Sequence, residues 1–265
     1  MAEIRMGKKF HPGLVSVTFR QLPPRQIVDL SSQAGLVGIE WGGDVHVPHG
    51  DLTLARQVNQ MTLDAGLRVA AYGSYYRVWP QEPAPFEMVL ETALALGAPL
   101  IRVWAGKLGS DTADTTHWDM LVSEACRIAG LAATVGVRLA FEFHGGTLTD
   151  TDASARDLLT RAGHPNLGCY WQPRITASPA ENVSSLQGVL PWLDNLHVFH
   201  WRLASDGTYY RRPLSEGQLP WLHYLTEAAS APGDRFAMLE FVRDDSPSAF
   251  LEDAAVLAEL CREKG

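Results

Sequence analysis

Short apolar runs recur along the chain, and longer amphipathic stretches separate them. The runs are near-continuous rather than alternating, as expected for strands that are buried on both faces of a parallel sheet. They predict strands at 14–19, 36–41, 67–72, 100–104, 137–143, 167–171, 196–201 and 236–242. The intervening stretches predict helices at 24–34, 51–65, 86–96, 116–135, 154–162, 179–190, 220–229 and 247–262. The chain therefore repeats a strand–helix unit.

Glycines precede several of these strands at similar spacing. Gly35, Gly66, Gly97 and Gly136 lie 31, 31 and 39 residues apart. Each fits the position where a left-handed residue ends a helix before the next strand. Eight strands alternating with eight helices predict a single α/β domain over residues 1–265, folded as a (β/α)8 TIM barrel. A doubly wound open sheet is the alternative, but no GxGxxG segment follows a predicted strand.

Composition narrows the classes of partner. Of the 265 residues, 46% are hydrophobic and 20% are charged, which is enough to bury a full core. Lys and Arg number 22 against 30 Asp and Glu, and the formal charge of −8 disfavours a nucleic-acid partner. We see neither an apolar run of the ~20 residues that span a bilayer nor a secretory signal. We therefore expect a cytoplasmic protein with no membrane partner.

Three predicted strands end near a glutamate: Glu40, Glu142 and Glu240. In (β/α)8 barrels the carboxyl ends of the strands form the active site. A carboxylate after an apolar run is costly to bury unless it is paired, hydrogen-bonded or bound to a metal. Side chains alternate along a strand, so Glu142 and His144 should point the same way. Glutamates with one or two histidines predict a site for one divalent metal ion; Mn²⁺, Mg²⁺ or Co²⁺ is favoured, with Zn²⁺ or Fe²⁺ as alternatives.

Aromatic and polar side chains near the same strand ends are candidates for binding substrate. A tryptophan face can pack against a sugar ring, and basic groups can hold an oxyanion or hydroxyl groups. The candidates are Glu40, Trp41, His46, Arg102, Trp104, Lys107, His144, Trp171, His200 and Arg202. Structural alternatives are helix packing for the tryptophans, surface ion pairs for Arg102 and Lys107, and an exposed loop position for His46.

Five segments carry a family resemblance: GLVGIEWGGDVHVP, IRVWAG, RLAFEFHGGTLTDT, NLHVFHW and MLEF. They resemble the xylose isomerase-like TIM-barrel superfamily, and more narrowly its sugar phosphate isomerase/epimerase branch. The resemblance implies a metal held by Glu, Asp, His and Glu at strands five to eight. Carried over, these positions are Glu142, Gln172, His197 and Glu240. His197 is preferred to His200 because the family's His-x-x-Asp motif matches residues 197–200, with His200 replacing the Asp.

The sixth strand departs from the family pattern. Gln172 stands where the Asp ligand belongs, and the His that normally follows is missing. An amide oxygen can bind a hard cation but brings no charge. Two glutamates, one glutamine and one neutral histidine just balance a divalent ion. The family's usual set, with Asp, leaves one extra negative charge. We therefore expect weaker metal binding, or an altered role for the site.

The resemblance implies an isomerase or epimerase that acts on a small sugar or keto-polyol through an enediolate. Glu142 and Glu240 would be both metal ligands and the acid/base pair. If the enediolate expels a β-leaving group, the site is instead a lyase, acting on keto-polyols or 3-oxo-glycosides.

The missing Asp ligand at Gln172 keeps a further alternative open, a non-catalytic sugar-binding or partner subunit. The endonuclease relatives of this superfamily need several zinc ligands and a basic face. The acidic charge of this chain argues against an endonuclease. Because dimers and tetramers are common in the family, we expect a homo-oligomer.

Overall fold

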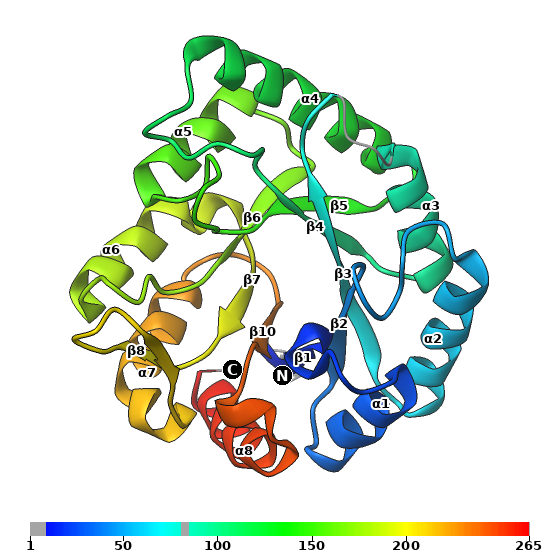
Figure 1. Cartoon of the computed structure of the whole chain (residues 1–265), viewed down its shortest axis with the longest axis vertical. Coiled ribbons are helices and arrows are strands. Elements are labelled where there is room, and N and C mark those ends of the chain that lie inside the picture. Colours follow the sequence, from blue (N-terminus) through cyan, green and yellow to red (C-terminus); the bar gives the residue numbers. More distant parts are fainter. Residues whose placement is uncertain (1–8, 81–84, 265) are drawn as a thin grey trace, which may run out of the picture.

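The computed structural model describes residues 9–80 and 85–264, and it is a closed parallel barrel ringed by helices (Figure 1). Around the barrel the strand order is β1-β10-β7-β6-β5-β4-β3-β2. The strands are β1 (Phe10–Val15), β2 (Gly38–Gly42), β3 (Arg68–Arg77), β4 (Leu100–Trp104), β5 (Arg138–Phe141), β6 (Leu167–Trp171), β7 (Leu193–Val198) and β10 (Arg235–Leu239). The predicted (β/α)8 barrel is confirmed.

The helices follow the strands in chain order. They are α1 (Pro24–Gln33), α2 (Leu52–Asp64), α3 (Phe86–Leu96), α4 (Thr115–Ala133), α5 (Asp152–Ala162), α6 (Pro179–Val189), α7 (Gln218–Ala228) and α8 (Pro247–Glu263). Short 3-10 helices are η1 (Ser16–Phe19), η2 (Leu190–Trp192), η3 (Leu214–Gly217) and η4 (Arg243–Asp245). Gly35, Gly66, Gly97 and Gly136 have φ between 68° and 74°, which confirms the predicted left-handed residues after α1 to α4. No helix of the described part of the chain is long and apolar enough to cross a bilayer.

The barrel is packed on both sides of the sheet. One apolar cluster fills the space between strands and helices. A smaller cluster includes Leu100, Ala140, Tyr170 and Met238, which come from four different strands. Because these strands lie around the barrel, this cluster fills the interior, as in other closed barrels of eight strands. The continuous apolar runs of the sequence follow from burial on both faces.

Several predicted strands differ at their ends, among them the third, which continues to Arg77, and the eighth, expected to reach 242, which ends at Leu239. The first, expected at 14–19, ends at Val15 because the Ser16 hydroxyl accepts a hydrogen bond from Gly42 N at 2.8 Å and the chain turns into η1. The fifth, expected to reach 143, ends at Phe141, and the Thr149 hydroxyl rather than a strand bonds the Glu142 carbonyl. The seventh, expected at 196–201, ends at Val198.

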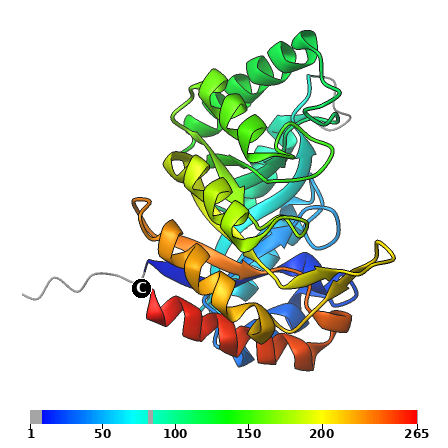
Figure 2. The same ribbon diagram turned by 90° about the vertical axis from the view of Figure 1, so that its left-hand side faces the viewer.

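A hairpin of β8 (Trp201–Leu203) and β9 (Tyr209–Arg211) follows β7 and was not predicted. Figure 2 shows this hairpin projecting beyond the barrel. Tyr209 and Tyr210 are each half exposed on it. The hairpin adds a wall at the same end of the barrel where β7 ends.

Gly168 on β6 should be intolerant of a side chain. A Cβ atom there would collide with Asp194 Oδ2 and lie 2.6 Å from Arg138 Nη2, disturbing an ion pair between β5 and β7. We expect Gly168→Ala to lower the free energy of unfolding by about 1–3 kcal/mol in urea denaturation. Gly130→Ala within α4 is the matched control, since among the described residues outside this helix the nearest atom to a Cβ there would be His164 Nε2, at 3.8 Å. It should be neutral or stabilising by up to about 1 kcal/mol. Equal stabilities of the two variants would contradict the packing described.

Candidate active site

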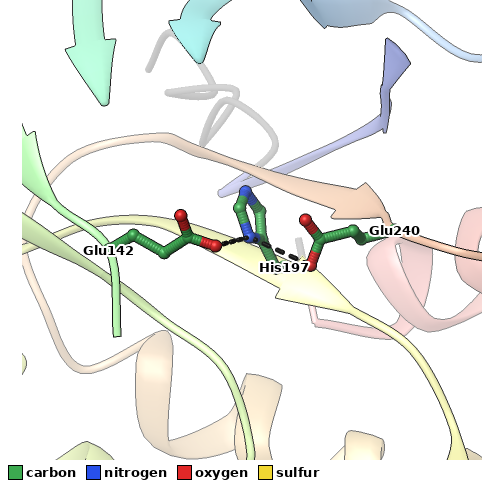
Figure 3. A group of neighbouring side chains, drawn as sticks. All are labelled: Glu142, His197 and Glu240. Atoms are coloured by element: carbon green, nitrogen blue, oxygen red, sulfur yellow. Dashed lines mark ion pairs between the residues drawn. The ribbon is translucent and has the colours of Figure 1, made fainter. Parts of the chain in front are cut away.

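Glu142, His197 and Glu240 meet at the carboxyl end of the barrel (Figure 3). His197 Nδ1 lies 3.5 Å from Glu142 Oε1 and 3.3 Å from Glu240 Oε2. All three side chains are buried, and ligand atoms from the three lie within 4.8 Å of one another. This spacing suits a single metal ion, so the structure brings together three of the residues that the sequence nominated.

The strand ladder positions the two glutamates. Glu142 N donates to Val103 O of β4, and Glu240 N donates to Val198 O of β7, each at 3.0 Å. Each glutamate is thus the first residue beyond its own strand, still fixed to a neighbouring strand. The carboxylates reach the barrel axis from β5 and β10, while His197 comes from β7 between β6 and β10.

Gln172 completes the set that the family resemblance suggested. Its Nε2 donates to Phe143 O at 2.8 Å, and its Oε1 lies 3.1 Å from His197 Nδ1. The hydrogen bond to Phe143 orients the amide so that its oxygen faces the cluster. Three oxygens and one imidazole nitrogen are therefore available, a donor set suited to a hard or borderline divalent cation.

Arg102 of β4 bridges two buried carboxylates. Its Nε donates to Glu40 Oε1 at 2.7 Å, and its Nη1 pairs with Glu142 Oε2. Trp104 Nε1 donates to the same Glu142 oxygen. Burial alone would raise the pKa of Glu142, but the Arg102 charge and hydrogen bonds from His197 and Trp104 lower that pKa to about 2. Glu142 therefore stays ionised.

Charge balance supports a cation at this position. Burial alone would lower the pKa of His197, but the carboxylates of Glu240, Glu142 and Glu40 raise that pKa well above its usual value. Three carboxylates against one Arg102 guanidinium leave two negative charges. A divalent ion beside a neutral imidazole would balance them, so the residues fit the metal that the family resemblance implies.

Gly73 on β3 leaves the room that this network occupies. A Cβ atom at Gly73 would lie 2.7 Å from Arg102 Nη2 and 2.7 Å from Glu40 Oε1. A larger residue would push the guanidinium off its carboxylates, so this strand position is restricted by the site rather than by the barrel.

A cavity of about 650 Å³ opens above the carboxylates, a size that fits a small molecule. Glu142, Glu240, Arg102 and Gln172 line its floor. Its aromatic lining comprises Tyr75, Trp104, Phe143, Phe199, Trp201, Tyr209 and Phe241, and Arg20, His144 and Arg174 add polar groups.

Three of the residues expected to bind substrate line this cavity: Arg102, Trp104 and His144. The His144 ring lies 4.3 Å from the Trp104 ring, centroid to centroid. His144 thus shares the site with Glu142 as predicted, but not through strand alternation, because β5 ends at Phe141 and Phe143 also lines the cavity. Glu40 is fully buried within the ion-pair network and does not line the cavity.

Trp41 and Trp171 were expected to bind substrate, and the structure shows that this prediction was wrong. Both are fully buried and face the helices instead of the cavity. Trp41 Nε1 donates to Thr62 of α2 at 3.2 Å. Trp171 Nε1 donates to Ser185 of α6 at 3.3 Å. Each directly neighbours a residue that faces the barrel interior, so strand alternation turns it outward.

The remaining candidates also lie outside the cavity lining. The His46 Nδ1 atom is 2.9 Å from the Ser16 hydroxyl in a buried loop contact. His200 packs against Gly217 of η3, and Lys107 lies on an exposed loop. Arg202 is exposed on the hairpin, 3.8 Å from Glu216. These four residues therefore have no contact with the proposed substrate space.

Sequence reasoning missed two cavity residues in particular, Tyr75 and Phe241. Tyr75 lies in a part of β3 where the register with β4 shifts. Phe241 directly follows Glu240, so regular alternation would turn it away from the cavity. The sequence signal for both is only an aromatic residue close to a strand end.

A family model described as xylose isomerase-like TIM barrel matches residues 28–260. Among curated proteins, the 3-dehydroshikimate dehydratase of Bacillus anthracis is 26% identical over 272 residues, which cover 92% of this chain and 95% of that protein.

Solved structures share the fold. A probable 3-DHS dehydratase of Bacillus anthracis, involved in petrobactin synthesis, matches with a TM-score of 0.77 and 23% identity over 94% of this chain and 98% of that one. D-psicose 3-epimerase, solved in the presence of D-fructose, matches with a TM-score of 0.71 and 15% identity over 97% of this chain and 100% of that one.

Replacing Arg102 tests whether the ion-pair network stabilises the fold. Arg102→Met leaves Glu40 and Glu142 buried without their cation, and we expect a loss of about 3–5 kcal/mol in the free energy of unfolding. Arg161→Met is the matched control, because its helical ion pair with Asp157 is nearly half exposed. That variant should lose at most about 1 kcal/mol. Similar losses in both variants, measured by urea denaturation at neutral pH, would show that the buried bridge has no special role.

Proposed function

The chain belongs to the xylose isomerase-like TIM barrel family, and on that basis we propose that it is a metal-dependent dehydratase. Its substrate would be a small hydroxylated ketone, from which it removes water by β-elimination. The observation that carries the proposal is the unequal environment of Glu142 and Glu240. An elimination can use one carboxylate base together with an acid of another type, whereas epimerisation by the carboxylate pair needs both glutamates to exchange protons.

Glu142, Gln172, His197 and Glu240 are the residues that would hold the metal. When bound, a divalent cation supplies positive charge that stabilises the oxyanion formed as a proton leaves the carbon next to a carbonyl. Gln172 keeps this site electrically balanced, because the ion-pair network already contains Glu40. An aspartate at that position would add a further buried negative charge.

Glu142 is poorly suited to exchange protons. Arg102 and Trp104 both bind its Oε2, and its pKa of about 2 keeps it ionised at neutral pH. Among the described residues, Glu240 has a single titratable partner within 4.0 Å, the imidazole of His197, and no Arg or Lys partner. We therefore assign the general base to Glu240 and give Glu142 the role of a fixed anionic ligand. This departs from the acid/base pair that the sequence suggested.

His144 is our candidate for the general acid. Its Nδ1 lies 2.8 Å from Gly145 O, which can only accept, so Nδ1 carries a proton and Nε2 is the nitrogen that can exchange one. In the proposed step, Glu240 removes the proton α to the carbonyl, and the electrons form the carbon–carbon double bond. With both ring nitrogens of His144 protonated, Nε2 gives its proton to the β-hydroxyl, which leaves as water, and the ring remains neutral with its proton on Nδ1.

The similarity to a 3-dehydroshikimate dehydratase over nearly the whole chain supports a lyase and suggests its test substrate. The epimerase among structures of the same fold supports the second candidate, a sugar isomerase or epimerase. That candidate uses the same carboxylates and would exchange the α-proton with solvent without losing water. A non-catalytic sugar-binding subunit would do neither.

Turnover with 3-dehydroshikimate is the direct test. The Mn²⁺-loaded protein should produce a more conjugated product, followed by ultraviolet absorbance, and EDTA should stop the reaction. Glu240→Gln should lower kcat by about 10²–10⁴-fold because the base is lost. Glu252→Gln is the matched control, since Glu252 is exposed on α8 and should leave kcat unchanged.

Product analysis in D₂O separates the alternatives. A new epimer or isomer of a ketose such as D-psicose, carrying deuterium and formed without loss of water, would overturn the dehydratase in favour of the epimerase. Binding of sugars without turnover or chelator effect would overturn both enzymatic proposals.

Gln172 provides a test of the metal site that does not depend on turnover. Gln172→Asp adds a carboxylate facing His197, and we expect Mn²⁺ to bind about tenfold or more tightly in isothermal titration of chelator-treated protein. Gln187→Asp adds the same charge on the exposed face of α6 and should leave the affinity unchanged. Elemental analysis of protein purified without chelator should find about one divalent ion per chain. No metal uptake by either form would contradict the site.

A further inference from the structure

Two aromatic residues of the cavity have an unusual backbone. Tyr75 and Phe241 have φ of 58° and 56°, in the left-handed region that residues with a side chain rarely adopt. In the described part of the chain, the other non-glycine residues with positive φ are Asp244 and Asp245, of a type that tolerates this region better. Bulky residues held there are typical of functional sites, because surrounding structure must maintain the strain.

Tyr75 reaches the cavity through an irregularity in β3. Gly73 is paired with Arg102, and Arg77 is paired with Trp104. Between these two pairings β3 therefore contains more residues than β4. The extra length forms a bulge that carries Tyr75. Its ring lies 5.2 Å from the Trp104 ring at 72° and 5.0 Å from the Arg102 guanidinium carbon. The bulge thus places an aromatic face directly above the ion-pair network.

Phe241 reaches the cavity through a turn at the end of β10. In a regular strand, neighbouring side chains face opposite sides, but here Glu240 and Phe241 both line the cavity. The left-handed φ makes this arrangement accessible. Thr18 Oγ1 accepts a hydrogen bond from Phe241 N at 3.0 Å and fixes the turn. The ring packs 6.0 Å from Trp201.

These residues belong to two aromatic walls. The first wall contains Tyr75, Trp104 and His144; the second wall contains Phe199, Trp201 and Phe241. The first wall stands on β3, β4 and the end of β5, and the second stands after β7 and β10. Around the closed barrel, β6 separates them on one side and β1 with β2 on the other. The walls therefore face each other across the carboxylates.

We infer that Tyr75 and Phe241 are specificity-determining residues that adapt the cavity to a small ring compound and against an open chain of similar composition. Aromatic faces fixed by the backbone can pack on both faces of a six-membered ring. A flexible polyol would lose more conformational entropy in the same slot. This inference names the substrate class of the proposed dehydratase and rests on that proposal for the chemistry, but it concerns binding and is tested without turnover.

Shikimate and D-gluconate make a suitable pair of probes, because both are carboxylates with several hydroxyls and only shikimate is a carbocycle. Isothermal titration of the Mn²⁺-loaded protein should show shikimate binding at least tenfold more tightly. Tyr75→Gly and Phe241→Gly should each reduce this preference at least fivefold. The Tm of both variants should stay within a few degrees of the parent, since glycine relieves the strained φ and offsets lost packing. Tyr75→Phe keeps the ring and should keep the preference.

Asp244→Gly is the matched control, because it also relieves a left-handed residue but lies outside the cavity lining. Its affinities for both probes should equal those of the parent. Equal affinities of shikimate and D-gluconate for the parent, no binding of either, or an unchanged preference in Tyr75→Gly and Phe241→Gly would each overturn the inference. A ring preference without turnover of 3-dehydroshikimate would instead uphold the inference and reject the dehydratase.

Discussion

The guanidinium of Arg102 allows several carboxylates to lie together at the top of an apolar barrel. An unpaired carboxylate costs several kcal/mol to bury, and this barrel end buries three. Arg102 pairs with Glu40 and Glu142, and in doing so it turns the second Glu142 oxygen toward His197. The glycine on β3 and the indole of Trp104 both accommodate that bridge. The orientation of the Glu142 carboxylate among the metal-binding candidates is therefore a consequence of one buried cation.

The same cation makes the two glutamates of the cluster chemically different. Glu142 Oε2 accepts hydrogen bonds from Arg102 and Trp104, which keep this carboxylate ionised. Glu240 instead faces His197 and the cavity. Identical side chains at corresponding strand ends thus acquire separate roles from their neighbours. A reaction in which one glutamate is a fixed anion and the other exchanges a proton fits this inequality better than a reaction in which both glutamates exchange protons.

Much of this arrangement could be predicted from the sequence. Apolar runs of strand length fix the barrel, and Glu142, His197 and Glu240 stand out because they interrupt or close such runs. The orientation of Trp41 and Trp171 could not be predicted, because a shift of one residue in strand phase exchanges the cavity for the helix layer. Tyr75 and Phe241 depend on a bulge and a left-handed turn, which no hydrophobic pattern records.

The floor and the walls of the cavity have different structural origins. Strand ends provide the floor, while a bulge in β3, the turn after β10 and the β8–β9 hairpin provide much of the walls. Insertions and deletions in these irregular segments can alter the walls without changing barrel register. Evolution could therefore exchange substrates within this lineage while inheriting the same carboxylates, and divergence between relatives should concentrate in those segments.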